Sequence, residues 1–271
     1  MLKSFDLNKP NYSKVLSQSI VSWLDYAFYS FGAYTNTSGN LSIVSMPGYS
    51  GGMVWGATKK NWVWEQDNIS ISQSGYTINY RDGLVYFNTV QSGVYASYSL
   101  KNIFVFDGKD NPFFRGDAGL LEVHQGSFRE HAVQLPCIAL ELGSSNSYPH
   151  AIGTYERDVR QDIIFNIFHK NPEVVEKISD ILYNQVDSHI ALFDFFRAYN
   201  SGDFPLNFNG TLTNRSGTYN NLINTHPYTE ARNYSCYINN TEIESVSKLD
   251  NSLYHGTVRF ETEAELSMGV Y

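Results

Sequence analysis

Cysteine and long apolar runs are scarce in this sequence. Only two cysteines, Cys137 and Cys236, occur among 271 residues, and each lies in an expected β-strand. The first residues, MLKSFDLNKP, lack the apolar core of a secretory leader. We therefore expect two buried free thiols and no disulfide. Every apolar run is shorter than the roughly 20 residues that a membrane-spanning helix needs, so we expect no membrane segment.

Basic residues are also few. Lysine and arginine total 19 against 27 aspartates and glutamates, which gives a formal net charge of −8 and a pI near 5.3. This balance argues against non-specific binding of nucleic acid or of an anionic membrane by the whole surface. The acidic charge balance is compatible with a protein past which DNA moves without binding.

The sequence lacks the common catalytic and cofactor motifs. There is no glycine-rich phosphate loop with a following lysine, no dinucleotide fingerprint after a strand, and no HExxH spacing among the seven histidines. Ser50 stands in a G-x-S-x-G match, GYSGG, but the residues that follow are aromatic and β-branched, whereas a nucleophile elbow requires a helix there. We expect no catalytic residue, no metal site and no cofactor.

Apolar and aromatic residues are plentiful. They make up 42% and 15% of the chain, enough for a proper core, and the aromatic share is typical of β-structure and of protein contact surfaces. Residues 13–31 carry apolar side chains at helical spacing, which predicts an amphipathic helix. From Trp62 to Phe106 the pattern predicts a small antiparallel β module of consecutive hairpins, with a turn at Asp82-Gly83 and IFVF as its last strand.

The segment NPFFRGDAG, residues 111–119, combines proline, glycine and charge and is the expected domain boundary. We predict an N-terminal helix plus β module over 1–112 and an α+β domain over 113–271. The second domain should hold strands at 137–142, about 155–168, 190–196, about 234–246 and 253–267, with a long loop at 197–233. Asn171-Pro172-Glu173 predicts a helix start, with a buried face of Val174, Ile178, Ile181, Leu182 and Val186. The expected fold is therefore α+β, a mainly antiparallel sheet flanked by helices.

The last strand alternates apolar and charged residues and places Glu261, Glu263 and Glu265 on one face. A row of glutamates repels itself and weakens strand pairing, so it needs an explanation. Two carboxylates among these or among Glu156, Asp158 and Asp162 could form a glycosidase pair, but charge rows are more often a solvated or interfacial face.

The segments LPCIALELG, GTYERDVRQDIIFNIFHKNPEVVEKISDILYNQV and YHGTVRFETEAEL resemble the tail-terminator and neck (tail-completion) proteins of tailed bacteriophages. The resemblance covers about half of the chain well and the first 110 residues loosely. It implies a non-enzymatic homo-oligomeric ring of the virion, a hexamer or else a dodecamer, assembled in the cytoplasm of the host bacterium. Such a ring caps the tail tube and joins it to the head connector.

Two interpretations of the charged residues follow from a ring. Arg157, Arg160 and Arg259 could meet the glutamate row of an adjacent subunit, or the glutamates could face the channel and repel DNA, which then passes without specific binding. The alternative function is a carbohydrate-binding or carbohydrate-cleaving virion protein, with Trp55, Trp62 and Trp64 stacking on sugars. We favour a β core for these tryptophans.

Overall fold

The computed structural model describes residues 11–30, 34–40, 42–44, 53–56, 62–69, 76–79, 84–87, 95–108, 135–151, 156–201, 219–250 and 253–267. The fold is mixed α+β, as predicted. The chain forms two compact units, each described separately below. The first comprises Met1–Val21, Ile103–Leu192 and Tyr228–Tyr271, and the second comprises Ser22–Asn102 and Phe193–Pro227.

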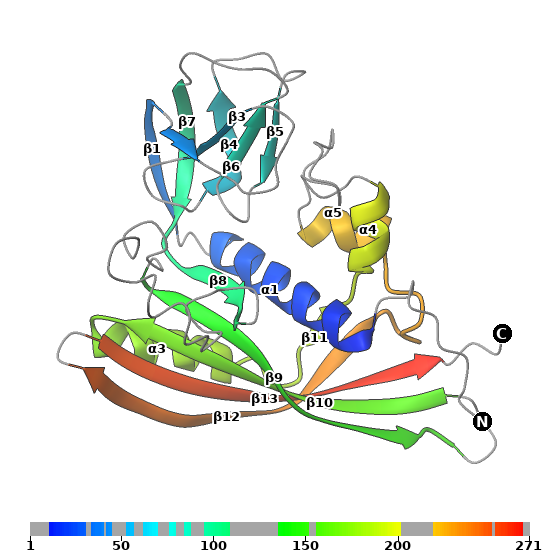
Figure 1. Ribbon diagram of the computed structural model, residues 1–271. Coiled ribbons are helices and arrows are strands. Elements are labelled where there is room, and N and C mark those ends of the chain that lie inside the picture. The colour runs from blue at the N-terminus through cyan, green and yellow to red at the C-terminus, as the bar shows by residue number, and fades with distance from the viewer. Residues whose placement is uncertain are drawn as a thin grey trace, which may run out of the picture. The chain divides into compact units, whose positions relative to one another are not determined.

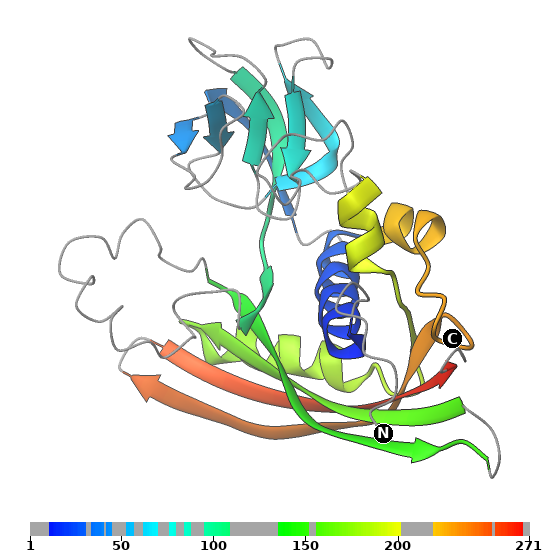
Figure 2. The same cartoon turned by 45° about the vertical axis from the view of Figure 1, so that its right-hand side comes forward.

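The first unit is built on a six-stranded sheet in the order β11-β12-β13-β10-β9-β8. Its long strands curve strongly along their length, as both views show (Figure 1 and Figure 2). Only β8 and β9 pair in parallel, so the sheet is mainly antiparallel, as predicted. The strands are β8 (Phe104–Asp107), β9 (Cys137–Pro149), β10 (Glu156–His169), β11 (His189–Ala191), β12 (Ser235–Asp250) and β13 (Leu253–Ser267).

One face of this sheet forms the core. Phe165 of β10 lies opposite Val258 of β13, and its ring meets that of Phe260 edge-on at 4.6 Å. All three are fully buried, and burial of each such side chain contributes roughly 1.5–3 kcal/mol. Helix α3 (Pro172–Tyr183) contacts β10, β12 and β13 and covers this face, so the alternating apolar residues find a partner layer.

Helix α3 begins as predicted. The Asn171 side chain accepts a hydrogen bond from the Glu173 backbone N–H at 3.0 Å, and a proline stands in the first turn. The buried face is rotated from the predicted one, which was wrong at Ile181 and Val186: each is 43% exposed. The buried residues follow the i, i+3, i+4, i+7 spacing that starts one residue later than predicted, at Val175, Ile178, Ser179 and Leu182.

Helix α1 (Tyr12–Ser30) agrees with the predicted helix at 13–31. Its residues 12–21 belong to the first unit, where Leu16 and Ile20 are fully buried. Ser17 on this helix donates a short hydrogen bond to the buried Asp107 of β8. The helix therefore supplies both apolar and polar contacts to the first unit.

The second unit contains two small antiparallel sheets with the strand orders β1-β7-β4 and β2-β3-β6-β5. The hairpin of β5 and β6 is confirmed, although its turn at Asp82-Gly83 lies outside the described residues. The remaining elements of this unit are β1 (Tyr34–Asn40), β2 (Ser42–Val44), β3 (Met53–Gly56), β4 (Trp62–Ile69), β5 (Tyr76–Asn79), β6 (Leu84–Phe87), β7 (Tyr95–Lys101), α4 (Phe195–Ser201) and α5 (Tyr219–Thr225).

Two features of the structure differ from the predicted organisation. The segment IFVF is not the last strand of the N-terminal module: as β8 it pairs with β9 in the six-stranded sheet, where Phe106 packs with Cys137 and Ala139. The units consequently divide at 102/103 and include 193–227 in the second one, which differs from the predicted 1–112 and 113–271. This division reflects contacts between residues far apart in the chain, which local composition does not indicate.

The predicted loop at 197–233 contains regular structure. Helix α5 lies within it and α4 extends into it as far as Ser201, while residues 202–218 are outside the described part of the chain. Asp194 starts α4 by accepting a hydrogen bond from the Arg197 backbone N–H at 3.0 Å. Ala198 and Leu222 are buried, which gives each short helix an apolar anchor. The predicted strand at 190–196 is accordingly limited to β11.

Both cysteines are buried free thiols, as predicted. Burial raises the pKa of each to about 12.

Among the described helices, none is long and apolar enough to cross a membrane.

Candidate functional site: the charged face of the six-stranded sheet

The second face of β10 and β13 is charged and open. Because successive side chains of a strand point to opposite faces, the residues between the core positions share this face. We call it the charged face and define it by Asp158, Arg160 and Asp162 of β10 and Arg259, Glu261, Glu263 and Glu265 of β13. All seven side chains keep some exposure, from 17% at Asp162 to 61% at Arg160.

The strand register brings like charges together at two levels. Asp158 lies directly opposite Glu265, and Asp162 lies opposite Glu261. Like charges in directly opposed positions destabilise a sheet. A cationic group stands between the carboxylates at each of these two levels, and the level between them pairs Arg160 with Glu263.

Arg259 stands beside both carboxylates of one like-charged pair, Asp162 and Glu261. Its guanidinium Nη2 lies 2.8 Å from Asp162 Oδ2 and 3.8 Å from Glu261 Oε1. The hydrogen bond to Asp162 and the charge of Asp162 raise the pKa of Arg259, and Glu261 and Glu244 add to the effect. Charge-assisted bonds of this kind are shorter and stronger than neutral ones.

Arg160 occupies the middle level. Its Nε lies 3.3 Å from Glu263 Oε2, and the Asn239 amide of β12 donates a 2.6 Å hydrogen bond to the same carboxylate oxygen. The guanidinium also stacks 5.9 Å above the ring of Tyr148 on β9. One side chain thus links three neighbouring strands through contacts on the charged face.

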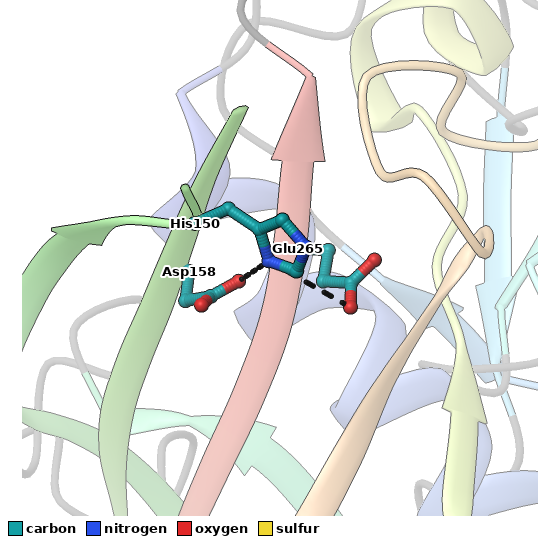
Figure 3. A group of neighbouring side chains, drawn as sticks. All are labelled: His150, Asp158 and Glu265. Atoms are coloured by element: carbon teal, nitrogen blue, oxygen red, sulfur yellow. Dashed lines mark hydrogen bonds and ion pairs between the residues drawn. The ribbon is translucent and has the colours of Figure 1, made fainter. Parts of the chain in front are cut away.

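His150, which follows β9, neutralises the second like-charged pair (Figure 3). Its Nδ1 donates to Asp158 Oδ1 at 2.9 Å and lies 4.0 Å from Glu265 Oε1. The figure shows the ring between the two carboxylates, one on β10 and one on β13. The hydrogen bond to Asp158 is the main cause of a raised His150 pKa, with the charges of Asp158, Glu265 and Glu156 acting in the same direction.

Arg232 completes this group from the segment that precedes β12. Its Nη1 lies 3.4 Å from Glu156 and 3.4 Å from Glu265. The backbone N–H of Arg232 also donates to the Glu265 carbonyl at 2.8 Å. We call His150, Glu156, Asp158, Arg232 and Glu265 the end clamp, because they join β9, β10, β13 and the approach to β12 at one end of the sheet.

The end clamp has the donor types of a divalent metal site. His150, Asp158 and Glu265 each offer one ligand atom, and these atoms lie within 4.8 Å of one another. All three already take part in hydrogen bonds or ion pairs. The Arg232 cation also stands beside Glu265, and beside the neighbouring Glu156. The group therefore works chemically as an ion-paired connection between strands.

No known protein family, curated protein or solved structure matches this chain.

Five of the six residues predicted for a subunit interface or channel lie on the charged face. Arg160 and Arg259 form ion pairs with Glu263 and Glu261 of their own chain. Arg157 is the exception: it lies opposite Leu266, on the other face of the sheet.

Sequence analysis missed His150, Arg232 and Asn239. No local signal identifies them, because each contacts a carboxylate of β13: His150 and Arg232 lie beside Glu265, and Asn239 donates to Glu263. Ser50 lies outside the described residues. Trp55 is in β3, and Trp62 and Trp64 are in β4, with side chains that also lie outside the described part.

Proposed function

We propose that this chain is a structural protein of a tailed-bacteriophage virion, a tail terminator or tail-completion protein of the neck. It forms a hexameric ring that caps the tail tube and joins it to the head connector. Support comes from the resemblance of the segments around 135–186 and 254–266. It also comes from the order strand, strand, helix and closing strands over β9, β10, α3, β12 and β13.

The main structural support for the proposal is the charged face. Five carboxylates and two guanidinium groups share it, and a cation of the same chain lies beside the carboxylates at each of the three cross-strand levels. Such a face is stable in water without a covering partner. Its excess of negative charge repels phosphates, which suits the wall of a channel that DNA must pass without binding.

We accordingly favour the channel interpretation of the glutamate row over pairing with a neighbour. Arg160 and Arg259 already neutralise carboxylates of their own chain. An arginine exchanged to an adjacent subunit would leave the carboxylates of its own chain without their cation, and loss of a charge-assisted partner costs free energy.

The first test is the mass of the purified full-length chain, by native mass spectrometry at several concentrations, alone and with purified tail tubes. The proposal expects a six-fold species, or a monomer that becomes a six-fold ring at tube ends in electron micrographs. A chain that stays monomeric and does not bind tubes contradicts it.

The channel interpretation has its own test, since reversing the charge of the wall should retain DNA. The double variant Glu261→Lys with Glu263→Lys should bind duplex DNA in a salt-dependent manner, while the wild-type ring should not. The control is Glu176→Lys with Asp180→Lys, the same charge change on two exposed positions of α3. Equal DNA binding by both variants would contradict a channel location for the charged face.

A further inference from the structure

The six-stranded sheet has two long open edges. Strand β12 pairs with β11 only over residues 235–237, and β9 pairs with β8 only over residues 137–140. Beyond these points, each strand has a neighbour on one side only within the described part of the chain. Unpaired backbone N–H and C=O groups along such edges are templates for another strand.

Both edges are exposed to solvent. Residues 242–249 of β12 are exposed without interruption, and so are residues 143–150 from β9 onward. Apolar side chains lie along the first edge at Ile243, Val246 and Leu249, which are 36%, 40% and 54% exposed. The second edge carries Tyr148, which is 50% exposed. Covering these side chains would add apolar burial to the backbone hydrogen bonds of a strand pair.

Bulges limit where a strand can be added. The pairing of β12 with β13 contains an extra β12 residue near Asn239, Glu244 and Leu249. One bulge lies in β9 at Gly143 and Ser144, whose carbonyls each accept a 3.0 Å hydrogen bond from the Gln161 side chain. Because bulges bend an edge away from a partner, the regular segments 245–248 of β12 and 145–148 of β9 are the usable parts.

Charge distinguishes the pairings that these edges allow. The β12 edge carries Glu242, Glu244, Lys248 and Asp250, whereas residues 142–149 of β9 carry no charge. Two β12 edges in parallel register would place Glu244 beside Glu244 and Lys248 beside Lys248 of the other copy, which disfavours that pairing. An antiparallel pair of β12 edges would close as a two-fold dimer and would leave both β9 edges uncovered. A neutral β9 edge meets the acidic β12 edge without a like-charge contact.

We propose that the open edge of β12 takes the open edge of β9 from a second copy of this chain. The two edges lie on opposite sides of one sheet, so the contact is head-to-tail and repeats from copy to copy, and a closing rotation makes it a ring. This inference rests on the ring-forming part of the proposed function and names the surface that joins the subunits.

The test is disulfide trapping in the full-length chain. Asn146 lies opposite Arg160, and Ser247 lies opposite His255, so both point to the charged-face side of the sheet and are exposed. The double variant Asn146→Cys with Ser247→Cys should form a ladder of covalent oligomers up to the ring size under mild oxidation. Asn146→Cys with Ser245→Cys tests the neighbouring register. Native Cys137 and Cys236 are buried, which keeps the background low.

Single variants and one remote pair are the controls. Asn146→Cys alone, Ser247→Cys alone, and Asn146→Cys with Glu176→Cys on α3 should remain uncrosslinked. Dimers from the first would show β9 pairing with β9, and dimers from the second would show β12 pairing with β12. Either result overturns the inference.

Native mass spectrometry of the same samples separates the two proposals. A ring that neither double variant cross-links means that subunits join through another surface, so the inference fails while the proposed function survives. A chain that is monomeric with and without tail tubes means that both fail. A ladder together with a ring of matching subunit number supports both.

Discussion

At the scale of single residues, interposed cations make the glutamate row compatible with a sheet. Asp158 and Glu265 face one another across two strands, and so do Asp162 and Glu261. His150 and Arg259 stand between the members of these pairs. The repulsion among the three glutamates of β13 is therefore offset by His150 after β9, Arg160 of β10 and Arg259 of β13 itself.

The end clamp predicts a pH-dependent stability. The pKa of His150 is raised above 6.5, so its protonated form stabilises the folded state below that pH. This contribution is lost as the pH rises through the folded-state pKa. We expect His150→Gln to lower the urea midpoint at about pH 5.5, where ordinary carboxylates are still charged, and to have little effect at about pH 8.5.

Arg232→Gln is the matched control for this experiment. It removes the other cation of the end clamp, whose charge does not titrate in this range. The decrease in the urea midpoint that this variant causes should therefore not become larger between about pH 8.5 and about pH 5.5, as the decrease caused by His150→Gln should. A His150→Gln effect that is equally large at both pH values would contradict the assigned role.

Gly256 sets how closely α3 approaches the sheet. A Cβ atom at this position would lie 2.6 Å from Val175 Cγ1 and 3.1 Å from Ser179 Oγ. Both are buried residues of α3, so the helix would have to shift. We expect Gly256→Ala to lower the free energy of unfolding by about 1–3 kcal/mol in urea titrations. The substitution Val175→Ala removes the side chain that the new Cβ would meet. It should therefore lower the free energy of unfolding less in the Gly256→Ala background than in the wild type. Strictly additive losses in the double variant would contradict this explanation.

At the scale of elements, local signals placed most starts to within a residue, but not the lengths: the strand predicted at 137–142 extends to Pro149, and the one predicted at 190–196 ends at Ala191. The alternation at 253–267 gave β13 its bounds, and the Asn-Pro-Glu sequence gave the start of α3. The bulges of β12 and the parallel pairing of β8 could not be read locally, because each depends on which strand lies alongside. The same holds for the end clamp, which draws on four separate segments.

The cap of α3 can be tested as an element. Asn171→Ala removes the acceptor for the Glu173 backbone N–H and should lower stability by about 1 kcal/mol. Asn171→Asp keeps an acceptor and adds a negative charge at the helix start, so it should be nearly neutral. Equal losses in the two variants, measured by urea unfolding, would show that the side-chain bond is not the cause.

At the scale of the whole molecule, the two cysteines report on the opening of the first unit. Cys137 lies in β9 and Cys236 in β12, both buried, and burial raises each pKa to about 12. Since the thiolate is the reactive form, labelling by a disulfide reagent at about pH 8 should be slow and should accelerate with urea as the unit unfolds. The exposed Ser247→Cys variant should add one fast phase without urea. Fast labelling of the wild type would show that the sheet opens locally.

The sequence by itself determined the α+β class, the main helices, the long final strands and the two buried thiols. Hydrophobic periodicity and capping residues act over a few neighbouring positions, so they can be recognised in the sequence. Only the tertiary structure decided that β8 joins the second-half strands, that 193–227 belongs to one compact unit with 22–102, and that His150 and Arg232 meet Glu265. Those outcomes depend on apolar burial and ion pairing between residues far apart in the chain, and no local pattern records which distant partner will supply them.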